Sequence, residues 1–178
     1  LKLEPDRLLA GFREDAGLPP KAKRYGAWEA QGVAGHTLGH YLSACSKMYR
    51  ATGNEQFRER VAYIVEELAA CQDANGNGYV AAIPDGKRVF AELARGEIRS
   101  QGFDLNGCWV PWYTTHKVMA GLRDAYLCTA NEKALTVVIS PLQSLMKDQV
   151  DNLEARGITK AVTINGLLDP IERAKALS

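Results

Sequence analysis

A helix that ends in a tight corner occurs twice in this sequence, and this repeat constrains the fold more than any other feature. The segment Tyr49–Glu55 reads YRATGNE and recurs as Tyr126–Glu132, which reads YLCTANE. Before each corner, apolar residues follow a helical spacing. One helix hairpin cannot bury its apolar face alone, so the repeat predicts stacked hairpins, either in a closed α/α toroid or in an open solenoid. We favour the toroid.

The helices of the first hairpin can be placed from their ends. One helix is expected to follow Gly35 and to stop at Gly53, and Asn54 can cap the next helix. A third helix is expected to start near Thr114. Residues 73–113, between the repeats, are rich in glycine and aromatic residues. A connection that long is usually functional. Short strands are predicted within it at 78–83 and 88–91, and we expect it to lie over the mouth of the toroid.

Composition narrows the classes of partner. The chain has 22 basic and 21 acidic residues, a net charge of +1, which argues against nucleic acid and an anionic membrane surface as partners. Its apolar runs are shorter than the ~20 residues of a membrane span. The start at Leu1, with Glu4 and Asp6 close behind, does not resemble a signal peptide, so we expect an internal piece of a longer protein.

The composition changes after residue 134. All tryptophans, tyrosines, phenylalanines, cysteines and histidines precede Leu135. From there the pattern predicts a βαβα segment: strands at 135–139 and 158–164, and helices that begin near Pro141 and Asp169. We therefore predict two domains, residues 1–134 and 135–178. The predicted fold class is mainly α, a partial α/α barrel followed by a short slice of an α/β domain.

Two stretches of the first domain are candidates for a binding site. The motif GHTLGH places His36 and His40 on one helical face, a geometry that can hold a metal. A third ligand at recognisable spacing is missing, so core or cavity histidines are the alternative and we predict no metal site. The stretch 109–116 (WVPWYTTH) combines aromatic rings with hydroxyls and His116, which suits a sugar, although Trp109 and Trp112 can equally be core residues. Glu29, after Trp28, is a possible hydroxyl ligand or a surface residue.

Two other sequence features give weaker evidence for a functional site. The segment 73–78 (DANGNG) imitates the start of a calcium loop, but Pro84 occupies the position of the required glutamate. The four cysteines form no C-x-x-C pair, and free buried thiols are expected.

These motifs carry a family resemblance. Residues 1–134 resemble the N-terminal part of glycoside hydrolase family 127, the bacterial β-L-arabinofuranosidases. The matching motifs are LAGFR at 9–13, YGAWE at 25–29, GHTLGHYLSA at 35–44, NGNGY at 75–79 and PWYTTHK at 111–117. The resemblance implies an (α/α)-barrel enzyme that removes terminal L-arabinofuranose from glycans. It also implies that His36 and His116 line the sugar subsite, to which we add Trp28, Glu29 and Trp112 as candidates.

The same resemblance implies catalytic groups that this chain lacks. In that family a zinc-bound cysteine is the nucleophile and a glutamate is the acid/base, and both lie downstream of the matched region. A retaining glycosidase needs both groups, so we predict no catalytic residue here and an inactive chain without zinc.

Residues 135–178 carry a second resemblance, to RecQ-type ATP-dependent DNA helicases, through SPLQSLMKDQV at 140–150 and the residues up to Arg173. It implies weak DNA-backbone contacts at Ser140 and Pro141. The sequence has no G-x-x-x-x-G-K-[ST] loop for the ATP and magnesium of that family, which argues against helicase activity. The alternative to a glycosidase fragment is thus a helicase fragment, or a chimera of both with no retained activity. The two parents disagree on compartment, extracellular or periplasmic against cytoplasmic, so the location is left open.

Overall fold

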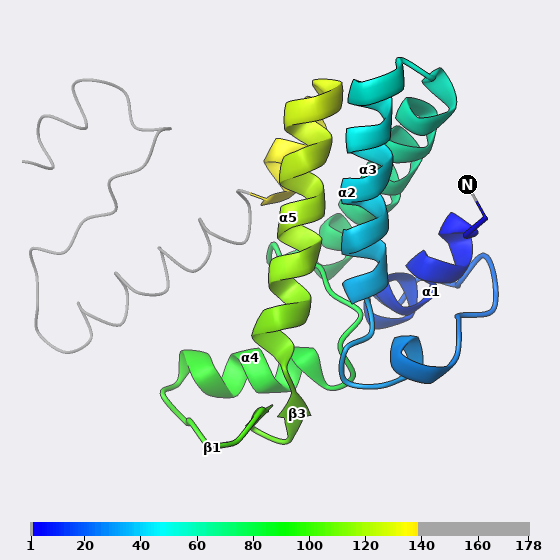
Figure 1. The fold of residues 1–178 in the computed structure, drawn as a ribbon. Helices are drawn as coiled ribbons and strands as arrows, with labels where there is room; N and C mark the ends of the chain where they lie inside the picture. The colour runs from blue at the N-terminus through cyan, green and yellow to red at the C-terminus, as the bar shows by residue number, and fades with distance from the viewer. Residues whose placement is uncertain (1, 139–178) are drawn as a thin grey trace, which may run out of the picture. The chain divides into compact units, whose positions relative to one another are not determined.

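The computed structural model describes residues 2–138 of the chain (Figure 1). They belong to the first of two units, Leu1–Pro141; the second, Leu142–Ser178, lies outside the described residues. The long helices are α1 (Pro5–Asp15), α2 (His36–Thr52), α3 (Glu55–Asn75) and α5 (Pro111–Thr129). Shorter elements are a 3-10 turn η1 (Ala27–Ala30), the helix α4 (Gly86–Ala94) and strands β1 (Ser100–Gln101), β2 (Asp104–Leu105) and β3 (Cys108–Trp109). The fold is mainly helical, as predicted. Its closure into a toroid stays a prediction.

The predicted hairpin repeat is present. Helix α2 ends at Gly53, whose φ of 66° is left-handed, and the Asn54 side chain caps α3 by accepting from the Gln56 N–H. In the second copy Ala130 takes the place of Gly53, again left-handed with φ of 53°. Asn131 then takes the place of Asn54, and its side chain accepts from the Ala134 N–H. Residues 132–138 are helical, so the second hairpin has its partner helix.

This helix corrects the strand predicted at 135–139. Ala134 and Val137 are both buried in the main core, a spacing of three that fits a helix and not an alternating strand. The side-chain amide of Gln72 donates to the Val137 carbonyl oxygen at 2.9 Å, joining the turn to α3. The β-branched run was therefore a misleading signal, because burial against α3 overrode strand propensity. The other elements predicted for the βαβα segment lie outside the described residues.

Ala130 gives a test of the repeat. A left-handed backbone strains alanine but not glycine. We expect Ala130→Gly to raise the free energy of unfolding by about 1 kcal/mol. Ala44, exposed within α2, is the control, since Ala44→Gly should lower the same quantity by about 1 kcal/mol. Urea unfolding followed by circular dichroism measures both, and a loss of stability in both variants would contradict the repeat geometry.

The connection between the hairpins is more ordered than predicted. Residues 78–83 form no strand, and the strand predicted at 88–91 lies instead within α4. There Val89 is buried and Arg88 pairs with Glu92 one turn later, at 2.8 Å, so helical spacing decides the structure. The strands lie further on, and β1, β2 and β3 form an antiparallel sheet in that order. Figure 1 shows this sheet and α4 near the N-terminal end of α5.

The main core lies among the long helices. Its largest fully buried side chains include Phe12, Leu9, Leu38, Leu42, Ile64, Leu68 and Leu122. Helices α2 and α5 run side by side (Figure 1). Their backbones meet at two glycines: a Cβ on Gly39 would lie 2.7 Å from the Val118 nitrogen, and one on Gly121 would lie 2.6 Å from the Gly39 oxygen. The two backbones can approach this closely because neither glycine carries a side chain. No helix within 2–138 combines the length and apolarity of a membrane crossing.

Candidate functional site

The Glu29 carboxylate is held at the N-terminus of α2. Its Oε2 accepts from the Gly35 N–H at 2.9 Å and its Oε1 from the Thr37 N–H at 3.2 Å. These amides start α2 and have no partner within the helix, and the helix dipole favours a negative charge there. Gly35 makes the approach possible, because its φ of 100° is left-handed and an added Cβ would meet the Phe12 ring at 2.8 Å. The Glu29 side chain is only 11% exposed, so it is a fixed part of the site and not a surface residue.

The same carboxylate orients His36. The Nδ1 of His36 lies 2.7 Å from the Val33 carbonyl oxygen and 3.3 Å from Glu29 Oε1. Both neighbours are acceptors, so this network assigns the proton to Nδ1. In the neutral ring Nε2 is then an acceptor, and it lies 3.5 Å from Thr37 Oγ1. His36 therefore has one ring nitrogen, Nε2, that can accept a hydrogen bond.

An aromatic cavity opens beside His36. Its volume is about 310 Å³, near the lower end for small-molecule pockets. We call it the aromatic cavity; its lining residues are Trp28, Val33, His36, Phe103, Trp109, Val110 and Tyr113. Trp28 and Phe103 remain 61% and 80% exposed, so their faces are available for stacking. The cavity thus combines apolar ring faces with two polar groups, the His36 imidazole and the Tyr113 hydroxyl.

His40 lies one turn along α2 from His36. Its Nε2 is 3.3 Å from the Tyr113 hydroxyl, and the Lys117 ammonium lies 5.1 Å from the centre of the Tyr113 ring. Partial burial, and then the nearby Lys117 ammonium and His36 imidazole, lower the pKa of His40. His40 is therefore neutral at pH 7 and does not add a positive charge beside the aromatic cavity.

The structure brings together three of the five predicted sugar-binding residues: Trp28, Glu29 and His36. Helix α5 starts at Pro111, earlier than predicted, so Trp112 lies in its first turn and packs against Phe90, with ring centroids 5.3 Å apart. His116 lines a separate groove of about 720 Å³ with Lys47 and Asp124. Neither residue lines the aromatic cavity. Ser140 and Pro141 lie outside the described residues.

Sequence reasoning missed some residues of the cavity. Tyr113 belongs to the aromatic stretch that was singled out, but its neighbours Trp112 and His116 were chosen instead. Phe103 follows a glycine in the turn between β1 and β2 and carries no motif, so its place depended on the sheet. The sequence left open whether Trp109 is a core residue or a site residue. In the structure Trp109 is 44% exposed and lines the cavity.

The donors of the described residues do not fit a zinc site. In 2–138 there is no group of three or more His, Cys, Asp or Glu side chains that could share a metal. Cys45, Cys71 and Cys108 are buried free thiols, and Cys128 is half-buried. Burial raises the pKa of Cys71 to about 11 and also raises those of Cys45 and Cys108, so these groups stay protonated rather than becoming thiolate ligands.

The comparison with family models decides the family. The model for the β-L-arabinofuranosidase GH127 catalytic domain matches residues 1–164. The chain belongs to glycoside hydrolase family 127. Membership implies a glycan as substrate in general terms. No curated protein matches the chain.

The family match reaches further than the resemblance predicted for residues 1–134. It covers the helical residues 132–138, which pack into the core of the described unit, and continues to residue 164. The helicase resemblance of residues 135–178 finds no support in the comparisons. That resemblance, the domain boundary at 134/135 and the chimera remain predictions.

Proposed function

We propose that this GH127 chain binds a terminal L-arabinofuranosyl residue of a glycan at the aromatic cavity. The observation that carries the proposal is the fixed Glu29–His36 pair at the edge of that cavity, at 3.3 Å. A furanose ring has a C–H face that stacks on an aromatic ring and hydroxyls that need partners. Trp28 and Tyr113 supply aromatic rings for stacking, and Nε2 of His36 supplies a hydrogen-bond acceptor for a hydroxyl.

Glu29 acts in this proposal as a positioning residue. Its two oxygens accept the Gly35 and Thr37 amides, and Oε1 also lies beside Nδ1 of His36. The carboxylate thereby keeps the proton on Nδ1 and the acceptor Nε2 toward the ligand.

We further propose that the chain binds the sugar without hydrolysing it. A retaining glycosidase places a nucleophile and an acid/base on opposite sides of the scissile bond. The side chains lining the aromatic cavity are aromatic or aliphatic apart from the His36 imidazole and the Tyr113 hydroxyl. The described residues thus provide one wall of a sugar site, and we assign them recognition rather than bond cleavage.

The test is binding of methyl β-L-arabinofuranoside by the full chain, followed by ligand-detected NMR. We expect Trp28→Ala to weaken binding about tenfold through loss of the stacking face. Glu29→Gln should weaken binding by a similar factor, because a neutral amide releases the His36 tautomer. Trp112→Ala is the matched control: Trp112 is 59% exposed, close to the 61% of Trp28, but lies outside the cavity.

Circular dichroism must show that each variant retains the helical content of the parent chain. Equal binding by the parent and by Trp28→Ala would refute the proposed site, as would a loss confined to Trp112→Ala or His116→Ala. Absence of any arabinofuranoside binding by the parent chain would refute the function itself.

A further inference from the structure

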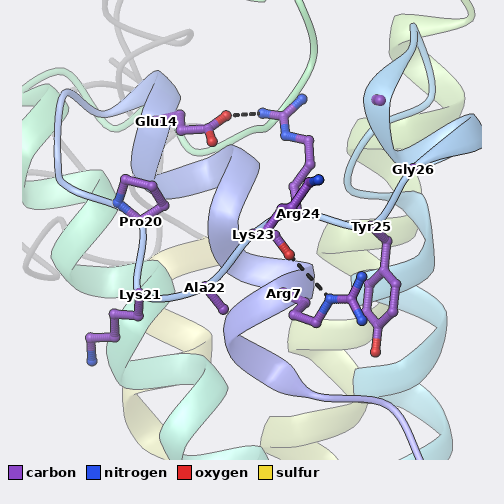
Figure 2. A pocket seen from close by; sticks show the side chains of 10 residues that line it. Arg7, Glu14, Pro20, Lys21, Ala22, Lys23, Arg24, Tyr25 and Gly26 are labelled. Atoms are coloured by element: carbon purple, nitrogen blue, oxygen red, sulfur yellow. Dashed lines mark hydrogen bonds and ion pairs between the residues drawn. The ribbon is translucent and has the colours of Figure 1, made fainter.

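A second cavity, of about 790 Å³, lies between α1 and the chain that leads to η1 (Figure 2). We call it the basic cavity. Its lining includes four basic residues, Arg7, Lys21, Lys23 and Arg24, together with Glu14 and Tyr25. The chain as a whole is close to neutral, with a net charge of +1, so this concentration of positive charge is local.

The Arg7 side chain is held in place by the Tyr25 ring and by the Lys23 backbone. Its guanidinium carbon lies 3.9 Å from the centre of the Tyr25 ring, and Nε donates to the Lys23 carbonyl oxygen at 3.1 Å. Figure 2 shows the guanidinium stacked beside that ring. Within residues 2–138 neither Nη nitrogen has a hydrogen-bond or ion-pair partner. A planar guanidinium fixed in this way can bind a carboxylate or phosphate through two hydrogen bonds.

Arg24 is held by a different set of contacts. Its Nη2 pairs with Glu14 at 2.5 Å, while its buried Nε has no hydrogen-bond partner among the described residues. Gly11 leaves the space for this guanidinium, since an added Cβ would lie 2.7 Å from Nη2. A buried donor without a partner is costly, so this nitrogen favours an acceptor.

The cavity carries positive charge that the described residues do not neutralise. Glu14 offsets Arg24, and Glu67 offsets Lys21, which it meets at 2.7 Å. In Figure 2 the Lys21 ammonium extends away from Arg7 and Arg24. Arg7 and Lys23 have no acidic partner in the described part of the chain. These two cations, Lys23 and the Arg7 guanidinium that stacks on the Tyr25 ring, indicate an anionic ligand.

One short segment connects this cavity to the aromatic cavity. Tyr25, Gly26 and Ala30 line the basic cavity, whereas Trp28, between them, lines the aromatic cavity. We propose that the basic cavity binds the anionic group of a sugar, either the carboxylate of a uronic acid or the phosphate of a sugar phosphate. This inference rests on the proposed function, because it makes the anionic sugar a neighbour of the neutral sugar bound beside Trp28.

The experiment measures binding of D-galacturonate to the full chain by NMR titration, with D-galactose as the uncharged counterpart. We expect galacturonate to bind and galactose to bind at least about tenfold more weakly, since hydrogen bonds to charged groups contribute most. Arg7→Gln and Lys23→Gln should each weaken galacturonate binding about tenfold. Arg50→Gln is the matched control, because Arg50 is exposed on α2 and lines neither cavity.

Titrations with further ligands identify the chemical class of the anion. Tighter binding of glucose 1-phosphate than of galacturonate would assign a sugar phosphate, and the reverse order a uronic acid. Inorganic phosphate binding as tightly as either sugar would overturn the inference of a sugar site, as would equal binding of galactose and galacturonate or an equal loss in Arg50→Gln. Failure of arabinofuranoside binding with retained galacturonate binding would refute the proposed function but not the anion site, and the opposite result would refute the anion site alone.

Discussion

Replacing Gly39 with alanine is expected to destabilise the described unit by about 3 kcal/mol, a large part of the stability of a domain of this size. The new Cβ would lie 2.7 Å from the Val118 nitrogen and closer still to the Lys117 carbonyl group. All these atoms belong to the backbone of α5, which cannot rotate away as a side chain can. The clash is therefore relieved only by separating α2 from α5, which opens the core that both helices cover.

Gly26→Ala is the matched control for this substitution. Gly26 has φ of −82°, and an added Cβ would meet no heavy atom within 4 Å. We expect its free energy of unfolding to change by no more than about 0.5 kcal/mol. Urea unfolding of both variants, followed by circular dichroism, gives the comparison. Equal stability of Gly39→Ala and the parent chain would mean that α2 and α5 do not approach as closely as the structure has them.

Local signals predicted the hairpin repeat well. The corner sequences placed Gly53, Asn54 and Asn131 correctly, because a left-handed stop and a side-chain cap are properties of a few adjacent residues. The motif GHTLGH also contains Gly39, and a glycine permits a close approach either by another chain segment or by a ligand. For Gly39 the answer is a chain segment, helix α5, and only the packing of distant residues could decide this.

The sequence was less informative where a short segment fitted both a helical and a strand periodicity. The segments 88–91 and 135–139 are short and largely apolar, and such runs fit a buried strand or a buried helix turn equally well. Contacts outside each segment accompany both helices: Glu92, one turn further along α4, in the first case, and the distant Gln72 in the second.

In the candidate site, too, the sequence predicted the local part better than the part that depends on distant residues. Trp28, Glu29 and His36 lie within a few residues of one another, so the sequence could group them. His116 comes from a different helix, and the direction in which it projects depends on how α5 packs against α2. Tyr113 lies in the first turn of α5 and lines the aromatic cavity, whereas His116, three residues later, lines another groove.

Replacing Val137 with aspartate should destabilise the described unit by about 3 kcal/mol or more, because the Val137 side chain is 1% exposed and an unpaired carboxylate would be buried with it. Ala134→Asp should have a comparable effect, since Ala134 is fully buried on the same helical face. The exposed Thr136 provides the control, and Thr136→Asp should change the free energy of unfolding by no more than about 0.5 kcal/mol.

These variants also test the domain boundary predicted at 134/135. Tryptophan fluorescence reports on residues 1–134 alone, because all three tryptophans lie at or before position 112. If residues 135–178 formed a separate domain, Val137→Asp would leave the tryptophan-detected unfolding transition where it is in the parent chain. A strand over 135–139 would instead make Leu135→Asp as damaging as Val137→Asp, because alternate residues share a face. The helix that packs against Gln72 predicts a different order of destabilisation. Ala134→Asp and Val137→Asp should lower the free energy of unfolding strongly, and Leu135→Asp only slightly.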